Sequence, residues 1–364
     1  MGRLMRVLVV NAGSSSLKIS VIGREEETIA AASVAHGDTG ALIQFTATHA
    51  PLDASGHRIV HGGQDFSAPA LIDDEVIARL EALVPLAPLH QQVALDGVRT
   101  TMRALPGVPA VACFDTAFHA TLDRAASTYA IPAAWRQRWG LRRFGFHGLS
   151  HQWASRRALE LTGRAEAGSR VVTCHLGAGA SLCAVRAGRS VDTTMGFTPL
   201  EGLVMNTRSG TVDPGMILWL IRRAGVDSAE VEEALDRRSG LAALSGTDGD
   251  TRHVMAAAAA GDDGARLAIA VWVHRLRQSI GAMAATLGGV DVLVFTGGIG
   301  EHEPLLRAET AAGLGFLGVA LDAGANAAAT GDADVSATEA GCRTVVVTAR
   351  EDRQIARLVR ARLG

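Results

Sequence analysis

The chain has 364 residues, a formal net charge of −2, 48% hydrophobic residues and 4% aromatic residues. This length accommodates two ordinary domains with full cores, and the small net charge argues against a nucleic acid or an anionic membrane as partner. No signal peptide is recognisable before Asn11, and no apolar run approaches a membrane span. We therefore expect a cytoplasmic protein, in which the four scattered cysteines are reduced core residues.

The first predicted element is a hairpin over residues 7–21, and its pattern recurs at 171–185. Each segment is an apolar run, a turn of Gly, Ser and Ala, and a second apolar run, which predicts strand–turn–strand. Glycine lets backbone N–H groups approach an anion, and serine hydroxyls add donors. Lys18, the chain's single lysine, lies in the first hairpin and would suit phosphate, although a bias toward arginine explains it equally well. The repetition predicts a duplicated fold with a phosphate-holding hairpin in each half.

The rest of the first half alternates between strands and helices. Residues 23–56 are polar and alanine-rich, and they indicate a strand or two with loops. The elements predicted after them are a short strand at 57–63, a helix capped by Asp73 or Asp74, a second helix near 88–104, a buried strand at 108–114, and a helix from Ser150 to about Leu161.

The second half continues the alternation after its hairpin and a strand at 191–195. Residues 196–215 form a polar loop that is long for a compact domain, and loops of that length are often functional. The helix at 264–288 is apolar on most faces, so we expect it to be buried. The other predicted elements are helices near 214–224, 228–238 and 303–313, strands at 290–295 and 344–348, a glycine turn at 297–300, and a closing helix from Glu351. This alternation indicates an α/β fold.

Three charged residues lie where such elements end. Arg208, in the long loop, offers a planar fork for a carboxylate or a phosphate, but a solvated surface arginine is an equally good interpretation. Arg58 stands beside a flexible glycine turn, where a surface ion pair is the alternative. Asp115 ends a buried strand, on the side where ligands bind in α/β sheets, although it could equally cap a helix.

Two histidines and one glycine segment complete the candidates from the residues alone. His147 precedes a helix, and His175 opens the second hairpin turn. Histidines beside phosphate-type turns favour contact with transferring oxygens, although a lone histidine is more often structural. Gly297–Gly300 lacks the G-x-G-x-x-G spacing, so a dinucleotide-binding fold is a poor interpretation. No P-loop, G-x-S-x-G or H-E-x-x-H motif occurs, which excludes several hydrolase and NTPase classes.

Together these segments resemble the acetokinase family. The match extends from Val7 to Glu351 through Asn11–Lys18, His57–Gly63, Phe114–His119, Phe146–Gly148, His175–Gly177, Met195–Gly210, Phe295–Glu301 and Thr348–Glu351. The resemblance implies the fold of the acetate and sugar kinase/Hsp70/actin superfamily. This is an α/β, duplicated actin-like ATPase fold of two ribonuclease-H-like lobes with an active-site cleft between them. We expect residues 1–117 and 353–364 in the N-terminal lobe, and 118–352 in a C-terminal nucleotide-binding lobe.

The resemblance also implies a reaction: direct, reversible phosphoryl transfer from ATP to acetate with Mg²⁺ or Mn²⁺, usually in a homodimer. Arg58 and Arg208 match arginines that hold the acyl carboxylate and the phosphoryl group. Asp115 matches the acid that positions them, and His147 matches a histidine that stabilises the transition state. The further matches are Asn11 and Glu351 for the metal; Val60, Leu89, Phe146 and Pro199 for a wall around the acetate methyl; His90 for an active-site position without a defined role; and Lys18, His175, Gly177, Gly179, Asp250, Arg252, Gly297, Gly298, Ile299 and Gly300 for the nucleotide.

Three departures from the family pattern are visible. Ala178 and His302 stand where the family usually has asparagine, and the stretch between Lys18 and Arg58 is shorter than usual. None of them touches the arginine–aspartate–histidine centre, so we expect an active enzyme. A propionate or butyrate kinase with a deeper acyl pocket is the nearest alternative. A nucleotide-gated switch protein of the Hsp70/actin type is more distant, because two arginines beside an apolar patch favour a small carboxylate.

Overall fold

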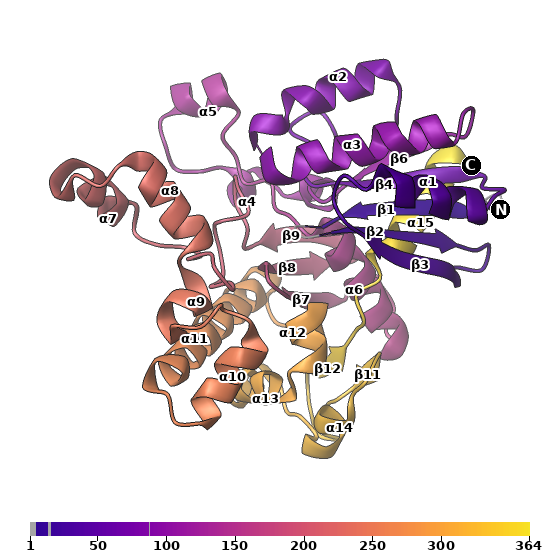
Figure 1. Cartoon of the computed structure of the whole chain (residues 1–364). Helices are drawn as coiled ribbons and strands as arrows, with labels where there is room; N and C mark the ends of the chain where they lie inside the picture. Colours follow the sequence, from indigo (N-terminus) through magenta and orange to yellow (C-terminus); the bar gives the residue numbers. More distant parts are fainter. Residues whose placement is uncertain (1–4, 14–15, 87) are drawn as a thin grey trace. The chain divides into compact units, whose positions relative to one another are not determined.

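The computed structural model describes residues 5–13, 16–86 and 88–364, except for the side chains of residues 88–90. The chain forms two compact units, whose elements are labelled in Figure 1. Unit 1 comprises Met1–Ala120, Phe146–Trp153 and Arg350–Gly364, and unit 2 comprises Thr121–Gly145 and Ala154–Ala349. Each unit contains one six-stranded mixed sheet.

The sheet of unit 1 has the order β3-β2-β1-β4-β6-β5. Strand β1 is antiparallel to β2 and parallel to β4, and β4 is parallel to β6. The strands are β1 (Val7–Ala12), β2 (Leu17–Ile22), β3 (Thr28–Val34), β4 (Ala54–Ile59), β5 (Ala70–Leu71) and β6 (Ala110–Phe114).

Alternating side chains along β1 give unit 1 a core on each face of its sheet. Leu8 and Val10 pack on one face with α1 (Thr39–Thr48), α2 (Asp74–Ala82) and α3 (Pro88–Ala104). Val7 and Val9 pack on the other face with α15 (Glu351–Leu363). Each buried valine or leucine contributes about 1.5–3 kcal/mol. Helix α15, the last element of the chain, is thereby fixed on the first strand.

The sheet of unit 2 repeats this topology. Its order is β11-β12-β10-β7-β8-β9, so β9-β8-β7-β10-β12 repeats β3-β2-β1-β4-β6 with the same parallel and antiparallel pairings. The strands are β7 (Arg170–Leu176), β8 (Ala180–Arg186), β9 (Arg189–Thr193), β10 (Val292–Thr296), β11 (Ala333–Asp334) and β12 (Arg343–Val346). The prediction of a duplicated α/β fold is therefore confirmed.

The longest helix of unit 2, α11 (Asp263–Leu287), packs on β8, β9 and β7. Helix α6 begins in unit 1 and continues in unit 2. The α-helices not yet given are α4 (Arg124–Ser127), α5 (Ala133–Trp139), α6 (Gly148–Leu161), α7 (Pro214–Trp219), which continues as a π-helix over Leu220–Ala224, α8 (Ser228–Arg237), α9 (Gly240–Ser245), α10 (Thr251–Ala259), α12 (Gly297–His302), α13 (Pro304–Ala312) and α14 (Ala323–Ala328).

Four expectations about these elements need correction. Residues 23–56 contain helix α1 as well as strand β3; Asp38 caps the helix by accepting the N–H of Ala41. Helices α9 and α10 follow α8 and were not predicted. Helix α11 has an exposed face, with Leu267 55% exposed, because much of its apolar character comes from alanines that tolerate solvent. Residues 297–300 form the start of helix α12 instead of a turn.

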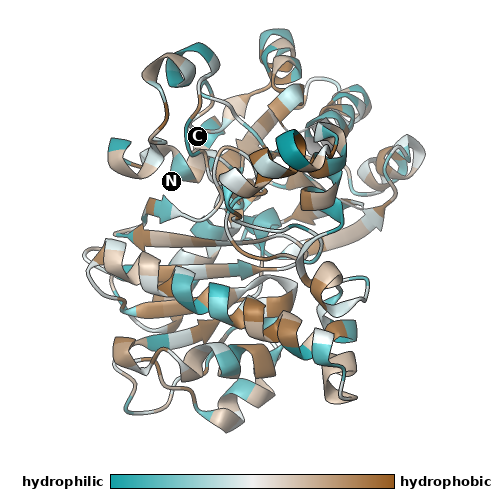
Figure 2. Cartoon of the chain, turned by 90° about the vertical axis from the view of Figure 1, so that its left-hand side faces the viewer, coloured by the Kyte–Doolittle hydropathy of each residue, from teal (hydrophilic) through white to brown (hydrophobic). Residues whose placement is uncertain are grey.

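The distribution of side chains fits this layered arrangement. In Figure 2 the strands are mostly hydrophobic, while the helices carry both colours. All four cysteines are buried, as expected of core residues.

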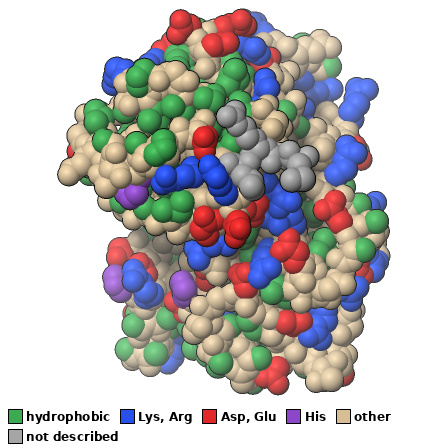
Figure 3. All heavy atoms as spheres, turned by 90° about the vertical axis from the view of Figure 1, so that its right-hand side faces the viewer, with side chains coloured by type: hydrophobic (Ala, Val, Ile, Leu, Met, Phe, Trp, Pro, Cys, Tyr) green, Lys and Arg blue, Asp and Glu red, His purple; other side chains and the backbone are tan. Residues whose placement is uncertain are grey.

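On the face drawn in Figure 3, basic and acidic side chains are intermingled among the residues described. Within the described part of the chain, no helix combines the length and hydropathy that crossing a bilayer requires.

Candidate active site

The register of the first sheet places four candidate residues on the same face. Asn11 pairs directly with Lys18 across β1 and β2, two positions beyond the Val9–Ser20 pair. Arg58, on β4, shares the face of Gly56, where an added Cβ would lie 2.6 Å from Ile355 and Val359 of α15. Asp115 follows β6 two residues after Cys113, which packs with α15. Because side chains alternate along strands, Asn11, Lys18, Arg58 and Asp115 all lie on the α15 face of the sheet.

Arg58 and Asp115 form a closely paired group at the ends of β4 and β6. The Arg58 Nε donates to both carboxylate oxygens at 3.1 Å, and its NH2 donates to Oδ2 at 2.6 Å. The Arg58 side chain is 13% exposed and that of Asp115 is 1% exposed. The parallel ladder between β4 and β6 pairs Ile59 with Phe114, which brings the two residues together. A bidentate pair of this kind fixes the direction of the guanidinium.

The electrostatics keep Arg58 charged. Burial alone would lower the pKa of Arg58, but the charges of Asp115 and Glu351 and the hydrogen bonds to Asp115 raise it above its ordinary value. Burial raises the pKa of Asp115, and Arg58 and a backbone hydrogen bond from His147 oppose that shift. The charge of Glu351 also raises the pKa of Asp115, and the net shift is upward. Because the protonated guanidinium donates to both carboxylate oxygens, we assign Asp115 as ionised and the two residues as an ion pair. The third guanidinium nitrogen of Arg58, NH1, donates to Asn11 Oδ1 at 3.2 Å.

Asp115 also positions His147 through the backbone. Besides the hydrogen bond from His147, the backbone N–H of Gly148 donates to the Asp115 carbonyl at 3.0 Å. A Cβ at Gly148 would lie 2.1 Å from that carbonyl oxygen, so only glycine permits this approach of α6. His147 itself has a φ of 56°, an unusual conformation for a non-glycine residue. Strained backbone of this type occurs preferentially at functional sites.

Asn11 and Glu351 offer oxygen atoms beside this pair. The Asn11 Nδ2 donates to Glu351 Oε2 at 2.7 Å, and Asn11 Oδ1 accepts from Arg58 NH1 at 3.2 Å. Amide and carboxylate oxygens suit Mg²⁺, which commonly takes one or two carboxylates together with phosphate oxygens and water. Among the residues described, no cluster of three or more His, Cys, Asp and Glu side chains could hold a metal by itself. The oxygens of Asn11 and Glu351 fit a Mg²⁺ ion whose other ligands would come from phosphate oxygens and water.

The apolar candidates of unit 1 are buried close to the polar group. Val60 directly follows β4 and is 6% exposed. Phe146 is also buried, and its ring lies 5.4 Å from that of His61 in an edge-to-face arrangement. Leu89 and His90 belong to α3, but their side chains lie outside the described part of the structure. Two of the four predicted wall positions therefore lie in unit 1 with their side chains described.

Unit 2 holds Arg208 in the long loop, which lacks regular secondary structure over residues 196–213. Arg208 NH1 donates to the carbonyl of Pro199 at 3.2 Å, and Nε lies 3.4 Å from Asp236 Oδ1. Burial lowers the pKa of Arg208, and the charge of Asp236 compensates only in part. Arg58 has a close bidentate carboxylate, whereas Arg208 is a partly buried cation, 20% exposed, with a more distant charge partner. An anionic ligand would stabilise it.

The second hairpin contains the other predicted phosphate contacts. His175 lies near the end of β7, and the turn over 177–179 is closed by a hydrogen bond from Gly177 N–H to the Gly179 carbonyl. The methyl group of Ala178 is exposed, and its carbonyl accepts the N–H of Asn206. The asparagine side chain usual in the family is thus replaced by an exposed methyl. In the first hairpin, Ser14 and Ser15 lie outside the described residues.

The remaining nucleotide candidates lie on short helices. Gly297, with a φ of 79°, begins α12 where a Cβ would lie 2.7 Å from the Leu176 carbonyl oxygen, so glycine is required there. Gly298 is exposed, whereas Ile299 and Gly300 are buried. Asp250 caps α10, and its side chain accepts from Arg252 at 2.6 and 2.9 Å. The hydrogen bond from Arg252 lowers the pKa of Asp250 to about 2.

One structural support of α12 was missed by the sequence analysis. Arg307 is 1% exposed, and its NH1 donates to the carbonyls of Gly300 and Glu301 at 2.9 Å. Its other nitrogens donate to Asn326, on Oδ1 at 2.8 Å and on the backbone oxygen at 2.7 Å. A buried arginine thus joins α12 to α13 and α14. In the sequence it is one arginine among many, and no motif distinguishes it.

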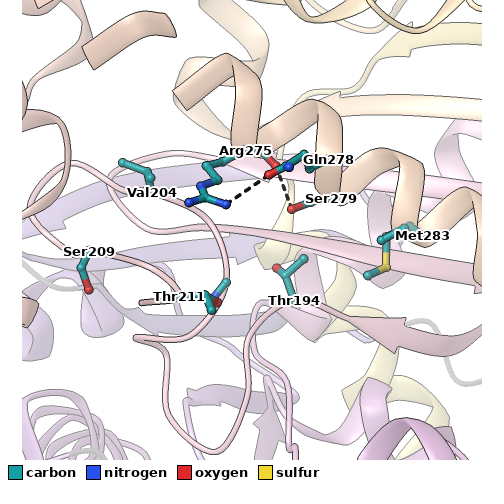
Figure 4. A pocket seen from close by; sticks show the side chains of 10 residues that line it. Thr194, Val204, Ser209, Thr211, Arg275, Gln278, Ser279 and Met283 are labelled. Atoms are coloured by element: carbon teal, nitrogen blue, oxygen red, sulfur yellow. Dashed lines mark hydrogen bonds between the residues drawn. The ribbon is translucent and has the colours of Figure 1, made fainter. Parts of the chain in front are cut away.

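A cavity of about 200 Å³ lies between the long loop and α11 (Figure 4). Ser209 and Thr211 of the loop line it opposite Arg275 and Gln278 of α11. Arg275 donates to Gln278 at 3.2 Å within its own helix. None of the predicted site residues lines this cavity, although Ser209 follows Arg208.

Comparisons with known sequences and with solved structures all point to the acetokinase family. The sequence profile of the acetokinase family matches residues 41–357. An acetate kinase of Synechococcus sp. is 44% identical, over 97% of this chain and 98% of that protein. The crystal structure of Porphyromonas gingivalis acetate kinase superposes with a TM-score of 0.91 at 34% identity, covering 99% of this chain and 100% of the other. A propionate kinase from Francisella tularensis superposes with a TM-score of 0.89 at 32% identity, covering 97% and 98%.

Proposed function

Because the chain belongs to the acetokinase family, whose members are phosphotransferases with a carboxyl group as acceptor, we propose that it transfers the γ-phosphoryl group of ATP to acetate. The products are ADP and acetyl phosphate, and the reaction is reversible. The observation that carries this proposal is the Arg58–Asp115 pair, a fixed guanidinium beside oxygen donors for a metal. The partly buried, weakly paired Arg208 adds a second cation that an anionic ligand would stabilise.

The reaction needs no nucleophile from the protein. Acetate is ionised at neutral pH, since carboxylic acids titrate near pH 4, and one of its oxygens attacks the γ-phosphorus directly. Positioning and neutralisation of the phosphoryl oxygens then supply most of the catalysis. Arg58 and Arg208 bind the carboxylate and the transferring phosphoryl oxygens. Asp115 holds Arg58 in place, and His147 donates to the phosphoryl oxygens as charge develops.

We further propose that Asn11 and Glu351 hold a Mg²⁺ ion, for which Mn²⁺ can substitute. Their oxygens and their proximity to Arg58 support this assignment. When bound, the ion neutralises charge on the nucleotide phosphates. Lys18 lies opposite Asn11 in the strand register and is assigned to the same phosphates.

We also propose nucleotide contacts in unit 2. Phosphate contacts come from His175, Gly177 and Gly179 of the second hairpin, in which N–H groups of a tight turn can bind anions. The adenosine contacts are assigned to Asp250, Arg252, Gly297, Gly298, Ile299 and Gly300. Val60, Leu89, Phe146 and Pro199 are assigned to the acetate methyl group, and His90 to a further active-site position.

We propose a homodimer that works in the cytoplasm. Four large apolar side chains are exposed on α7 and its π-helical continuation: Met216 (42%), Leu218 (50%), Trp219 (58%) and Ile221 (36%). Monomeric proteins seldom expose several such side chains next to one another. A surface of this composition fits contact with a second copy. Four buried cysteines fit a reducing compartment. Sedimentation velocity should give the mass of a dimer, and Trp219→Glu should shift it toward the monomer.

A propionate kinase is the second candidate, supported by the likeness to the Francisella tularensis structure. Both candidates are tested by hydroxylamine trapping, which converts an acyl phosphate into a coloured hydroxamate. With ATP and Mg²⁺ we expect kcat/KM to be highest for acetate and to fall for propionate and butyrate. A higher value for propionate would favour the second candidate. ADP release without hydroxamate from any of the three acids would refute both.

A further inference from the structure

Three side chains hold the start of the long loop, although the proposed reaction does not use them. Tyr129, Arg143 and Glu201 of unit 2, which we call the Tyr129 clamp, meet at the Glu201 carboxylate, which accepts a hydrogen bond from each of the other two. The Tyr129 hydroxyl donates to Glu201 Oε2 and accepts the backbone N–H of Phe197 at 2.8 Å. Arg143 NH2 donates to the other carboxylate oxygen, Glu201 Oε1, at 2.6 Å. Both capacities of the hydroxyl, donor and acceptor, are therefore used.

Arg143 connects the clamp to the end of β9. Its NH1 donates to three successive carbonyls, those of Thr193, Thr194 and Met195, at 3.2, 3.0 and 3.0 Å. Its guanidinium carbon lies 5.7 Å from the centre of the Tyr129 ring. One arginine thus holds both the entry of the loop and the carboxylate that binds the tyrosine. Lysine, with a compact ammonium, could not reproduce this fork.

The clamp encloses the segment that carries Pro199. Tyr129 contacts the loop at Phe197 and at Glu201, two residues before and two residues after Pro199. The Pro199 carbonyl in turn accepts the NH1 of Arg208 at 3.2 Å. Gly196 leaves room for this arrangement, because a Cβ there would lie 1.7 Å from Glu201 and 2.1 Å from the Tyr129 hydroxyl. A continuous chain of contacts therefore leads from Tyr129 to the guanidinium of Arg208.

We propose that Tyr129 and Glu201 are positioning residues that fix Arg208 and Pro199 for the acyl substrate. The inference rests on the proposed function, in which Arg208 binds the transferring group and Pro199 borders the acetate methyl. Misplacement of a reacting group by about 1 Å can cost about 100-fold in rate. The clamp therefore controls kcat and the choice of acyl chain. Nucleotide affinity, assigned to residues outside the clamp, does not depend on it.

The protonation state of the tyrosine supports this role. Burial, followed by the hydrogen bond to Glu201, raises the pKa of Tyr129 above its ordinary value. The hydroxyl therefore keeps its proton at neutral pH and remains a donor to the carboxylate.

The kinetic test uses Tyr129→Phe and Glu201→Gln, with Glu160→Gln as matched control. The control variant also removes a carboxylate that pairs with arginines, but this carboxylate lies on α6 and not in the long loop. We expect both clamp variants to lose about 10- to 100-fold in kcat/KM for acetate, and to show a changed acetate-to-propionate ratio. The dissociation constant for ATP should stay within about twofold of wild type, and the control should keep its activity. Clamp variants with near-normal kcat/KM, or with ATP affinity falling in parallel, would overturn the inference.

A second measurement is independent of turnover. Tyr129 is the chain's single tyrosine, so labelling tyrosine with ¹³C at Cζ gives one resonance. We expect the phenol to titrate above its ordinary value of about 10 in the wild type, and closer to it in Glu201→Gln. A phenol pKa of about 10 in the wild type would contradict the hydrogen-bonded, buried arrangement of Tyr129. A wild type that forms no acyl phosphate would refute the proposed function instead, which separates the two failures.

Discussion

The ion pair between Arg58 and Asp115 provides the most informative perturbation. Asp115→Asn keeps the size of the side chain but removes the charge that binds Arg58 through three hydrogen bonds. Loss of one member of a buried pair typically costs about 3–5 kcal/mol, because an uncompensated charge remains. Arg58 is still 13% exposed and keeps Asn11 and Glu351 as neighbours, so we expect the lower end of that range, about 3 kcal/mol.

A double variant separates stability from catalysis. Replacing both members of a buried pair can be nearly neutral, so Arg58→Met combined with Asp115→Asn should be more stable than Asp115→Asn alone. Turnover should nevertheless remain about 100-fold or more below wild type, because the guanidinium is absent. Urea unfolding gives the stabilities, and hydroxamate formation gives the rates. A double variant that loses the sum of the two single effects would refute the paired arrangement, and one with near-normal turnover would remove Arg58 from the mechanism.

Three further outcomes follow from the same geometry. Arg208→Ala should lower kcat about 10²–10³-fold, whereas Arg238→Ala, an exposed arginine on the neighbouring helix end, should retain activity. Val60→Ala should raise relative kcat/KM for propionate, since each added methylene that finds space contributes about 0.8 kcal/mol; an unchanged ratio would exclude Val60 from the acyl wall. Burial lowers the pKa of His57 from 6.5 to about 3, so the unfolded chain binds the proton first as pH falls. The contribution of His57 to the free energy of unfolding should therefore decrease by roughly 4 kcal/mol from pH 6.5 to pH 3, and His57→Gln should remove that decrease in urea titrations. A variant whose stability falls with pH in parallel with the wild type would contradict this.

Metal dependence is a separate expectation. Excess EDTA should abolish hydroxamate formation, and Mg²⁺ or Mn²⁺ should restore it, because Asn11 and Glu351 offer the hard oxygen ligands that these ions prefer. Glu351→Gln should raise the Mg²⁺ concentration required for half-maximal rate. Full activity in EDTA would contradict the assignment.

The duplicated architecture was predictable because apolar β-branched runs and glycine turns are strong local signals. Residues 7–21 and 171–185 carry them in the same order, and the two sheets have matching strand order. The face shared by Asn11, Arg58 and Asp115 follows from strand alternation once the register is known. That register depends on long-range pairing of β1, β4 and β6, which no local pattern encodes.

The features that escaped prediction have physical reasons. Helix α1 is weakly patterned, and its capping residue Asp38 looks like an ordinary loop aspartate. Alanine obscured the exposed face of α11, because it counts as apolar yet tolerates solvent. Tyr129 and Arg307 act through partners far away in sequence, Glu201 and Asn326 among them. Such tertiary hydrogen bonds leave no periodic signal in the chain.

The central claim, attack of a carboxylate oxygen on the γ-phosphorus, can be measured directly. The wild-type protein is incubated with ATP, Mg²⁺ and acetate labelled with ¹⁸O in both oxygens, and the products are followed by ³¹P NMR. We predict an acetyl phosphate resonance with the isotope shift of one ¹⁸O bound to phosphorus. An acetyl phosphate signal without that shift, or ADP and inorganic phosphate without acetyl phosphate, would contradict it.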